Sequence, residues 1–485
     1  MSNQKESLTL GILKYSISTW INLIVGLLSV VVTTRLINPH DYGLITIFIS
    51  STAFLMYILT LGLDSAFIRF YNDPPKGNTQ NQLLYKCLFI STVFCCIAGL
   101  LVFFSFSSKV SFFIFGIESK LLICLMFIYC LSQVWLRYLN ISFRMSFRAK
   151  QYNIQNILIN CLTRILIILS ALISNNYLFI ISILTIGIAS TLIIYLFVQK
   201  NEFTPINSQG QLDRSLDFSG FRPYFRFALF SAPTYIVVYF NTFMSQQIIR
   251  EEIDAHALGI FASVSMFISI LTAVQGGFST YWSAYVYKNY SEEDSKIKKM
   301  HDVIVAFAII MASAVVCSRD FIYLFIGSFY HSSKTFFSLI LILPILNFIR
   351  ETTDKGLQIS NNNHISLFIH ILTVMINLGL SYCLINKIGI IGAAIANAIS
   401  GVFLFTTSAY YGQKYFRTIN SIIKSSCGVF VLLCLLTLPS ITNNIMNIIF
   451  GTLLLDVIAF SIYKDEVGLM CNVVLSFLVK KKYNL

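Results

Sequence analysis

Long apolar segments fill most of the chain, and short polar stretches separate them. The first two segments cover residues 11–37 and 42–70, and the tetrapeptide NPHD at 38–41 joins them. Each is longer than the roughly 20 apolar residues that an α-helix needs to cross about 30 Å of hydrocarbon. These segments therefore predict two membrane-spanning helices connected by a tight turn.

Apolar segments of similar length recur to the end of the chain. Further spans are expected near residues 82–106, 117–140, 153–173, 177–198, 224–247, 257–284, 302–326, 334–357, 364–385, 388–411, 425–440 and 443–463. Only 11% of the residues are charged and 56% are hydrophobic, whereas about a quarter of a soluble domain is charged. The chain is therefore expected to be an all-α, polytopic membrane protein with about 14 transmembrane helices.

The longest polar stretch, residues 199–222, separates two sets of six predicted spans. In each set a long span ends in an arginine, Arg35 or Arg250, and a short acidic turn then leads to Gly43 or Gly259 at the start of the next span. Two similar lobes related by an axis along the membrane normal are a known transporter plan. We expect two six-helix lobes. The expected parts are an N-terminal lobe at 1–198, a cytoplasmic linker at 199–222, a C-terminal lobe at 223–412, and two additional helices with a basic tail at 413–485.

The distribution of positive charge predicts the orientation of the chain. If the N-terminus is cytoplasmic and the spans alternate, most of the 34 Lys and Arg residues lie in cytoplasmic segments, including Arg137, Arg350 and Lys355. Cytoplasmic loops of membrane proteins carry such an excess. Both termini are therefore expected in the cytoplasm, and the net charge of +13 is explained without a nucleic-acid partner.

The sequence contains no pattern typical of a cofactor or metal site. The 11 cysteines fall mostly inside apolar segments, where a free cysteine is a small hydrophobic residue. No phosphate-binding glycine loop or serine nucleophile motif is present, and we expect no catalytic residue, cofactor or metal. Energy would then come from an ion gradient, from the substrate gradient or from downstream consumption of the product.

Arg164 is the strongest candidate for a functional residue. It lies about 18 Å from the cytoplasmic start of its predicted span, near the middle of the membrane. An arginine at this depth is expected to face the protein interior or water, and a guanidinium group binds phosphate through two parallel hydrogen bonds. We expect Arg164 to contact the substrate or to set the charge of the cavity. The alternative is an arginine satisfied by carbonyls or by a carboxylate of another helix.

Other ionisable residues lie nearer the ends of the predicted spans. Asp64 and Lys14 are expected at the same depth, so they can pair. Asp64 is a candidate for ion coupling or gating, with a static pair as the alternative. The remaining candidates for cavity electrostatics are Lys14, Arg35, Arg226 and Arg250. Side chains near helix ends also reach the interface in ordinary membrane proteins, which is the alternative for these cations.

Two prolines are expected to bend the helices that contain them. Pro233 lies inside the span near 224–247 and Pro344 inside the span near 334–357. A proline inside a helix removes one backbone hydrogen bond and clashes with the preceding turn. We therefore predict helix kinks at these two positions.

Four short motifs carry a resemblance to a known family. They are TRLINPHDYG at 34–43, LGLDSAFIRF at 61–70, FRAKQY at 147–152 and IGIIGAAIANAIS at 388–400. In this order, together with the pattern of spans, they resemble the O-antigen and polysaccharide repeat-unit flippases of the Wzx type. That family belongs to the multidrug/oligosaccharidyl-lipid/polysaccharide exporter (MOP) superfamily, and the likeness covers essentially the whole chain.

The resemblance implies a transporter rather than an enzyme. It also implies that the two six-helix lobes surround a central cavity and that the two C-terminal helices are peripheral to them. It implies movement of undecaprenyl-pyrophosphate-linked oligosaccharide from the cytoplasmic to the periplasmic leaflet of the bacterial inner membrane by alternating access. This step would serve the synthesis of O-antigen, a part of lipopolysaccharide, or of a related surface polysaccharide. Implied partners are the lipid-linked substrate, membrane lipid, and the polymerase and chain-length proteins of the same pathway.

Two other functions fit the same sequence. One is an ion-coupled exporter of small molecules from the same superfamily. The other is a membrane polysaccharide polymerase, which usually carries a long extracytoplasmic loop. The short loops predicted on that face argue against a polymerase.

Overall fold

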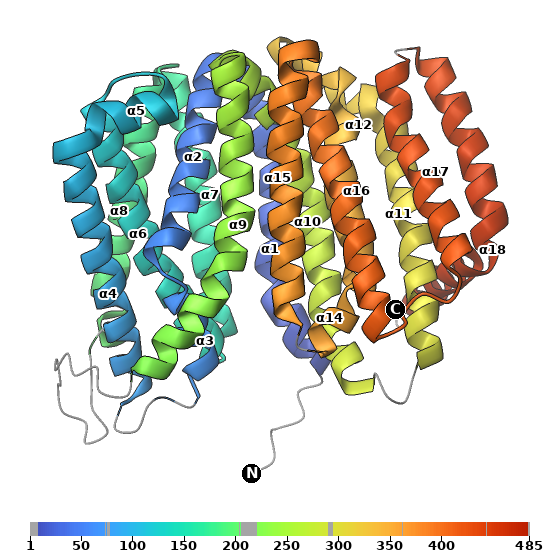
Figure 1. Cartoon of the computed structure of the whole chain (residues 1–485), viewed down its shortest axis with the longest axis horizontal. Helices are drawn as coiled ribbons and strands as arrows, with labels where there is room; N and C mark the ends of the chain where they lie inside the picture. Colours follow the sequence, from blue (N-terminus) through green and yellow to red (C-terminus); the bar gives the residue numbers. More distant parts are fainter. Residues whose placement is uncertain are drawn as a thin grey trace. The chain divides into compact units, whose positions relative to one another are not determined.

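The computed structural model describes residues 8–72, 74, 78–202, 204, 221–289, 294–360, 362–442 and 444–483. Every regular element in these ranges is a helix. The contacts between helices divide the chain into two units, Met1–Ala262 and Ser263–Leu485. Within each unit the long helices run side by side (Figure 1).

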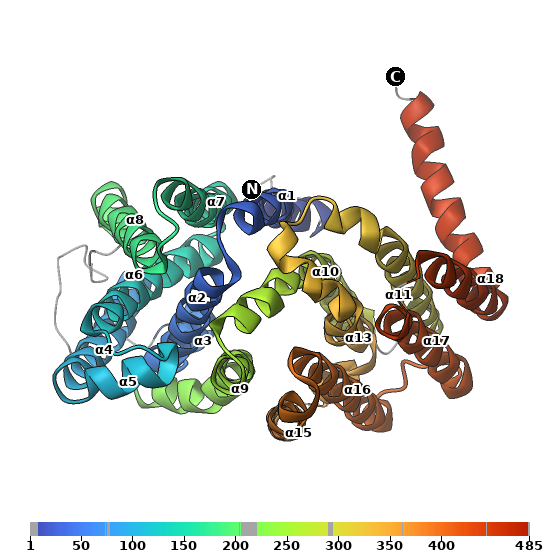
Figure 2. The same cartoon turned by 90° about the horizontal axis from the view of Figure 1, so that it is seen from above.

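Unit 1 is built around α2. Its helices are α1 (Leu8–Leu36), α2 (Pro39–Leu59), α3 (Leu63–Phe70), α4 (Gln80–Leu101), α5 (Ser107–Phe115), α6 (Lys120–Met145), α7 (Ala149–Ile173), α8 (Tyr177–Val198), α9 (Arg222–Glu252) and the start of α10 (Ala255–Asn289). A π-helical turn, Val102–Phe106, joins α4 to α5, and a short 3₁₀ helix, Lys200–Glu202, follows α8. α2 packs against α6, α8 and α9, and α1 packs against α7 (Figure 2).

The turn between α1 and α2 has the residues that start a helix. The side chain of Asn38 accepts a hydrogen bond from the backbone N–H of Asp41, and Pro39 occupies the first helical position. Asparagine caps one of the free N–H groups of a first turn, and proline needs no partner there. The NPHD turn therefore begins α2 firmly at residue 39.

The second span is broken, whereas the sequence predicted one helix over 42–70. Leu61 and Gly62 have positive φ angles of 51° and 72°, and α3 starts at Leu63. α9 passes close to the break, because a Cβ added to Gly62 would lie 2.4 Å from the carbonyl oxygen of Ala228. Only glycine fits both the backbone angle and this contact. The break places Asp64 in the first turn of α3, where the helix dipole favours a negative charge.

The first turns of α2 and α10 cross with almost no space between them. A Cβ on Gly43 would lie 2.0 Å from the carbonyl oxygen of Ala255, and a Cβ on Gly259 would lie 1.8 Å from that of Pro39. Each glycine thus meets the residue four positions before the other glycine. This reciprocal contact agrees with the sequence likeness between the two Arg-to-Gly segments, since small residues let membrane helices approach closely.

Unit 2 contains the rest of α10 and the C-terminal helices. These are α11 (Asp294–Tyr323), the 3₁₀ helix Ser328–Thr335, α12 (Phe337–Ile340), α13 (Ile342–Thr353), α14 (Lys355–Ile359), α15 (Asn363–Ile388), α16 (Ile390–Tyr415), α17 (Ile422–Ile441) and α18 (Ile445–Tyr483). α16 packs against α13 and α15, and α11 packs against α13, α17 and α18. A cluster of polar contacts, formed by Glu351 and Lys355, lies where α13 ends.

The helices confirm the predicted class. In the described residues, 13 helices are long and apolar enough to cross a membrane, and the count reaches 14 if the bent pair Ser328–Thr335 and Phe337–Thr353 is one span. That pair bends by 69° between Thr335 and Phe337, so the tenth span is bent before Pro344, where the sequence predicted the kink. The last span, expected at 443–463, ends at a non-helical residue, Tyr463, after which α18 continues. The lobe boundary at 199–222 stays a prediction.

Candidate functional site

A buried ion pair joins α3, which follows the break in the second span, to α6, which is the fourth span. Arg137 of α6 donates from Nε (2.9 Å) and Nη2 (2.6 Å) to Oδ2 of Asp64. The carboxylate side chain is 3% exposed and the guanidinium side chain 29%. Two opposite charges within hydrogen-bonding distance offset each other's cost of burial, whereas either one alone is costly. The pair is therefore electrically neutral and depends on both members.

Three tyrosines stack on one another, and one of them, Tyr57, contacts Arg137 of this ion pair. We call Tyr57, Tyr235 and Tyr239 the tyrosine stack. The ring of Tyr57 stacks on Tyr239 with centroids 4.1 Å apart, and on Tyr235 with centroids 5.8 Å apart. The guanidinium carbon of Arg137 lies 4.7 Å from the ring centroid of Tyr57. The Tyr57 hydroxyl donates to the Tyr239 hydroxyl at 3.2 Å. The stack thus joins α2 to α9 beside a neutral ion pair.

Asp64 has a different partner from the one expected. The sequence predicted a pair with Lys14, but the carboxylate accepts hydrogen bonds from Arg137. The side chain of Lys14 lies outside the described residues, so its own contacts stay a prediction. The hydrogen bonds of Asp64 connect α3 to α6 within unit 1.

Arg164 lies where α7 packs on α1. Its Nη1 donates to the hydroxyl of Ser29 at 2.7 Å and to the carbonyl of Gly26 at 3.4 Å. A Cβ on Gly26 would lie 3.3 Å from Nη2, so the glycine leaves room for the guanidinium group. No carboxylate pairs with Arg164 among the residues that the structure describes. This half-buried cation therefore has a hydroxyl and a carbonyl as partners, and no carboxylate of the described residues compensates its charge.

The other candidate cations are spread along the helices of unit 1. Arg250 donates from Nη2 to the carbonyl of Phe113 at 2.7 Å and pairs with Glu251 at 3.1 Å, which ties the end of α9 to α5. Arg35 lies in the last turn of α1 and is exposed, and Arg226 is exposed near the start of α9. The acidic run at Glu251 made a pair with Arg250 an alternative in the sequence, whereas the contact with Phe113 was not predicted.

The two prolines occupy different positions in their helices. Pro233 lies inside α9, which is continuous from Arg222 to Glu252. Pro344 lies in the first turn of α13, after the helix has already been interrupted at Leu341. The first turn needs no partner for the missing N–H, so proline suits that place.

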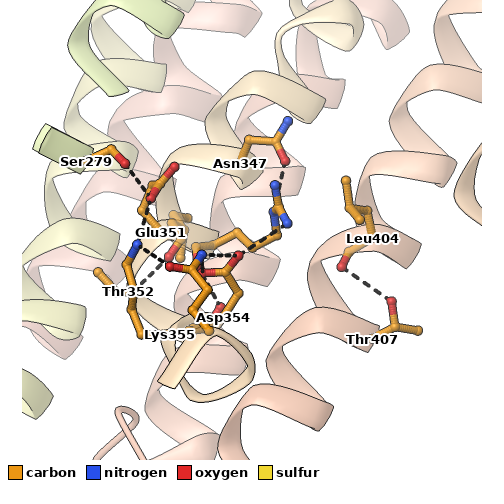
Figure 3. Close-up of polar contacts among 12 residues, drawn as sticks. Ser279, Asn347, Glu351, Thr352, Asp354, Lys355, Leu404 and Thr407 are labelled. Atoms are coloured by element: carbon orange, nitrogen blue, oxygen red, sulfur yellow. Dashed lines mark hydrogen bonds and ion pairs between the residues drawn. The ribbon is translucent and has the colours of Figure 1, made fainter. Parts of the chain in front are cut away.

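Unit 2 has a second buried polar cluster, where α13 meets α10 (Figure 3). Glu351 accepts hydrogen bonds from Gln275 at 3.0 Å and from Ser279 at 2.8 Å. The ammonium group of Lys355 lies 3.4 Å from Glu351 and donates to Ser283 at 2.9 Å. The Lys355 side chain is 2% exposed. Like the Asp64–Arg137 pair, this cluster holds a cation and an anion together at a break in a span.

The sequence did not single out three charged residues of these clusters, which are Arg137, Glu351 and Lys355. The alternation of spans placed Arg137, Arg350 and Lys355 with the cytoplasmic segments. For Lys355 a local signal existed, because Glu351 lies four residues before it, a spacing at which two helical side chains meet. Arg137 offered no such signal, since its partner is 73 residues away.

Comparisons with known proteins agree with this architecture. A family model described as "Polysaccharide biosynthesis protein" matches residues 8–287, which is more than half of the chain. The chain belongs to this polysaccharide biosynthesis family. No curated protein matches it.

Solved structures of transporters share the fold. The lipid II flippase MurJ, in an inward closed conformation, aligns with a TM-score of 0.68 and 17% identity over 95% of this chain and 99% of that chain. The MATE multidrug transporter DinF-BH aligns at 0.59 and 15% identity, over 86% and 98%. An inward-facing MATE family transporter of the MOP superfamily aligns at 0.53 and 15% identity, over 84% and 97%. The chain therefore shares the fold of these transporters.

Proposed function

We propose that this protein flips an undecaprenyl-pyrophosphate-linked oligosaccharide from the cytoplasmic to the periplasmic leaflet of the bacterial inner membrane. The observation that carries the proposal is the combination of a polysaccharide biosynthesis family with the MOP transporter fold. Polysaccharide repeat units built on a lipid in one leaflet must cross the bilayer before they are joined in the other. A multi-pass carrier meets that requirement.

Arg164 fits the negatively charged part of such a substrate. A pyrophosphate group needs cationic donors when it leaves water, and arginine offers a planar set of N–H groups to its oxygens. Among the described residues Arg164 has only a hydroxyl and a carbonyl as partners. Its positive charge is therefore available to an anionic ligand, and we assign the pyrophosphate contact to it.

The neutral Asp64–Arg137 pair fits a gating role better than binding of the pyrophosphate. The pair is neutral, and its two members come from helices α3 and α6 next to the break at Leu61 and Gly62. In our proposal the carrier works by alternating access, with both termini in the cytoplasm, and this pair holds the broken second span in one arrangement. Coupling to an ion at Asp64 would require the pair to open.

A deletion strain tests the proposed function. Lipid-linked oligosaccharide is extracted, and its leaflet is determined with a membrane-impermeant glycan-modifying enzyme on oriented vesicles. We expect completed repeat units to accumulate on the cytoplasmic side. Single units on the periplasmic side would indicate a polymerase instead, and an unchanged distribution would indicate a small-molecule exporter.

A further inference from the structure

The position of the tyrosine stack along α9 and the exposure of one of its rings are not explained by packing alone. Tyr235 lies 13 residues after the start of the 31-residue helix α9, about 20 Å along its axis. Tyrosines of membrane proteins usually concentrate at the two interfaces, where the hydroxyl meets water. Tyr235 is 48% exposed, whereas Tyr57 is 8% exposed. The stack thus presents one open aromatic ring near the middle of a membrane-spanning helix.

Several polar groups of the stack and of the neighbouring ion pair have unused hydrogen-bonding capacity. Arg137 donates to Asp64 from Nε and from Nη2. Its third nitrogen, Nη1, has no hydrogen-bond acceptor among the described residues. The Tyr239 hydroxyl accepts from Tyr57, so its own hydrogen is available for donation. The Tyr235 hydroxyl likewise has no partner among the described residues. An aromatic face therefore lies beside hydrogen-bond donors and acceptors that a ligand could satisfy.

These features select among the chemical classes of ligand. The carboxylate of Asp64 neutralises the nearby guanidinium group at 2.6 Å, so the stack gives no advantage to a phosphate or to an organic cation. A lipid chain would leave the hydroxyls and the free N–H without partners, which is costly in an apolar environment. The ligand that fits has an apolar face and also neutral hydroxyl groups.

A pyranose ring combines these two properties. The C–H bonds on one face of the sugar are weakly positive and meet the negative face of an aromatic ring, while the hydroxyls at the edge form hydrogen bonds. We propose that the tyrosine stack is a sugar-binding subsite, in which Tyr235 stacks on a pyranose and Tyr239 and Arg137 bind its hydroxyls. This inference rests on the proposed function, because it assigns the glycan part of the lipid-linked substrate to residues of its own.

Binding of two probes to the purified full-length protein tests this subsite. The probes are a polyprenyl pyrophosphate that carries one N-acetylglucosamine and the same lipid pyrophosphate without a sugar. We expect the wild-type protein to bind the sugar-bearing probe more tightly. Tyr235→Leu should weaken that binding about 3- to 10-fold and leave the bare probe unchanged. Tyr235→Phe, which keeps the ring, should stay within about twofold of the wild type.

A matched control separates stacking from packing. Phe230→Leu removes another exposed aromatic residue of α9, 73% exposed and outside the stack, and should change neither affinity. Equal weakening of both probes by Tyr235→Leu would show a structural effect and overturn the subsite. Equal affinity of the wild type for both probes would overturn it too, while the proposed function would stand. If the wild type bound neither probe, the proposed function itself would fail.

Discussion

Two arginines inside unit 1, Arg137 and Arg164, are treated differently by the protein around them. Arg137 makes two hydrogen bonds to Asp64, a carboxylate that is almost completely buried. Arg164 donates to the hydroxyl of Ser29 and the carbonyl of Gly26, and no carboxylate pairs with it in the described part of the chain. The first arginine is electrically neutralised and the second is not.

In our proposal this difference separates a structural charge from a functional one. A buried cation costs free energy, and a neighbouring carboxylate offsets that cost when the geometry is good. A protein that leaves such a cation uncompensated keeps its charge available for a ligand. We therefore assign the anionic part of the substrate to Arg164, and the integrity of the broken second span to the Asp64–Arg137 pair.

The largest expected effect comes from breaking the neutral pair. Asp64→Ala leaves Arg137 as an unpaired cation and should lower the free energy of unfolding by about 3–5 kcal/mol. Thermal unfolding of the purified protein in detergent measures the loss. The double variant Asp64→Ala with Arg137→Met removes both charges and should recover most of the stability. If the double variant is no more stable than Asp64→Ala, the loss of stability does not come from the unpaired charge of Arg137.

Removing the uncompensated arginine should act on binding rather than on stability. Arg164→Ala is expected to weaken binding of a polyprenyl pyrophosphate about 10- to 100-fold, because charge-assisted hydrogen bonds are worth about 1.5–3 kcal/mol. The melting temperature should change little, because the substitution breaks no ion pair of the described residues. Arg144→Ala, which removes an exposed cation near the end of α6, is the control. A large loss of stability without a loss of binding would make Arg164 structural.

The hydroxyl that holds Arg164 should matter less than the arginine itself. Ser29 accepts from Arg164 at 2.7 Å and donates to the Gly26 carbonyl at 2.7 Å. Ser29→Ala should weaken pyrophosphate binding about 2- to 6-fold, which corresponds to one hydrogen bond of about 1 kcal/mol. Thr46→Ala, whose hydroxyl bonds within its own helix, is the matched control. An effect of Ser29→Ala as large as that of Arg164→Ala would contradict an orienting role.

The smallest effect is expected for an ion pair outside the membrane spans. Arg148 and Glu202 form two hydrogen bonds, at 2.7 and 2.6 Å, and the Arg148 side chain is 32% exposed. The hydrogen bond to Glu202 raises the pKa of Arg148, so the guanidinium group stays charged. Solvent screens this pair, and Glu202→Ala should cost about 1 kcal/mol or less in thermal unfolding. A cost equal to that of Asp64→Ala would remove the distinction between buried and solvated pairs.

The sequence predicts the helices of this protein well and its charge partners poorly. Apolar runs of spanning length mark each membrane helix, and Arg164 is visible because it interrupts such a run without an acidic neighbour. The break at Leu61 and Gly62 is not visible, because the residues around it remain apolar and the close approach of Ala228 requires the tertiary structure.

Arg137 shows why the pairing could not be predicted. A cation near the end of an apolar run looks the same in sequence whether it points to water or back into the protein. Its partner Asp64 lies 73 residues earlier, and depth alone allowed Lys14 as well. Long-range partners of this kind are set by the helix packing, since only neighbouring helices in the folded protein can bring them together.

Transbilayer movement in liposomes tests the central claim most directly. The purified protein is reconstituted with a polyprenyl-pyrophosphate-linked sugar in both leaflets, and an impermeant glycan-modifying enzyme is added outside. We predict that the wild-type protein makes nearly all of the sugar accessible, whereas protein-free liposomes expose only about half. Accessibility that stays at the level of protein-free liposomes would contradict a flippase for lipid-linked sugar.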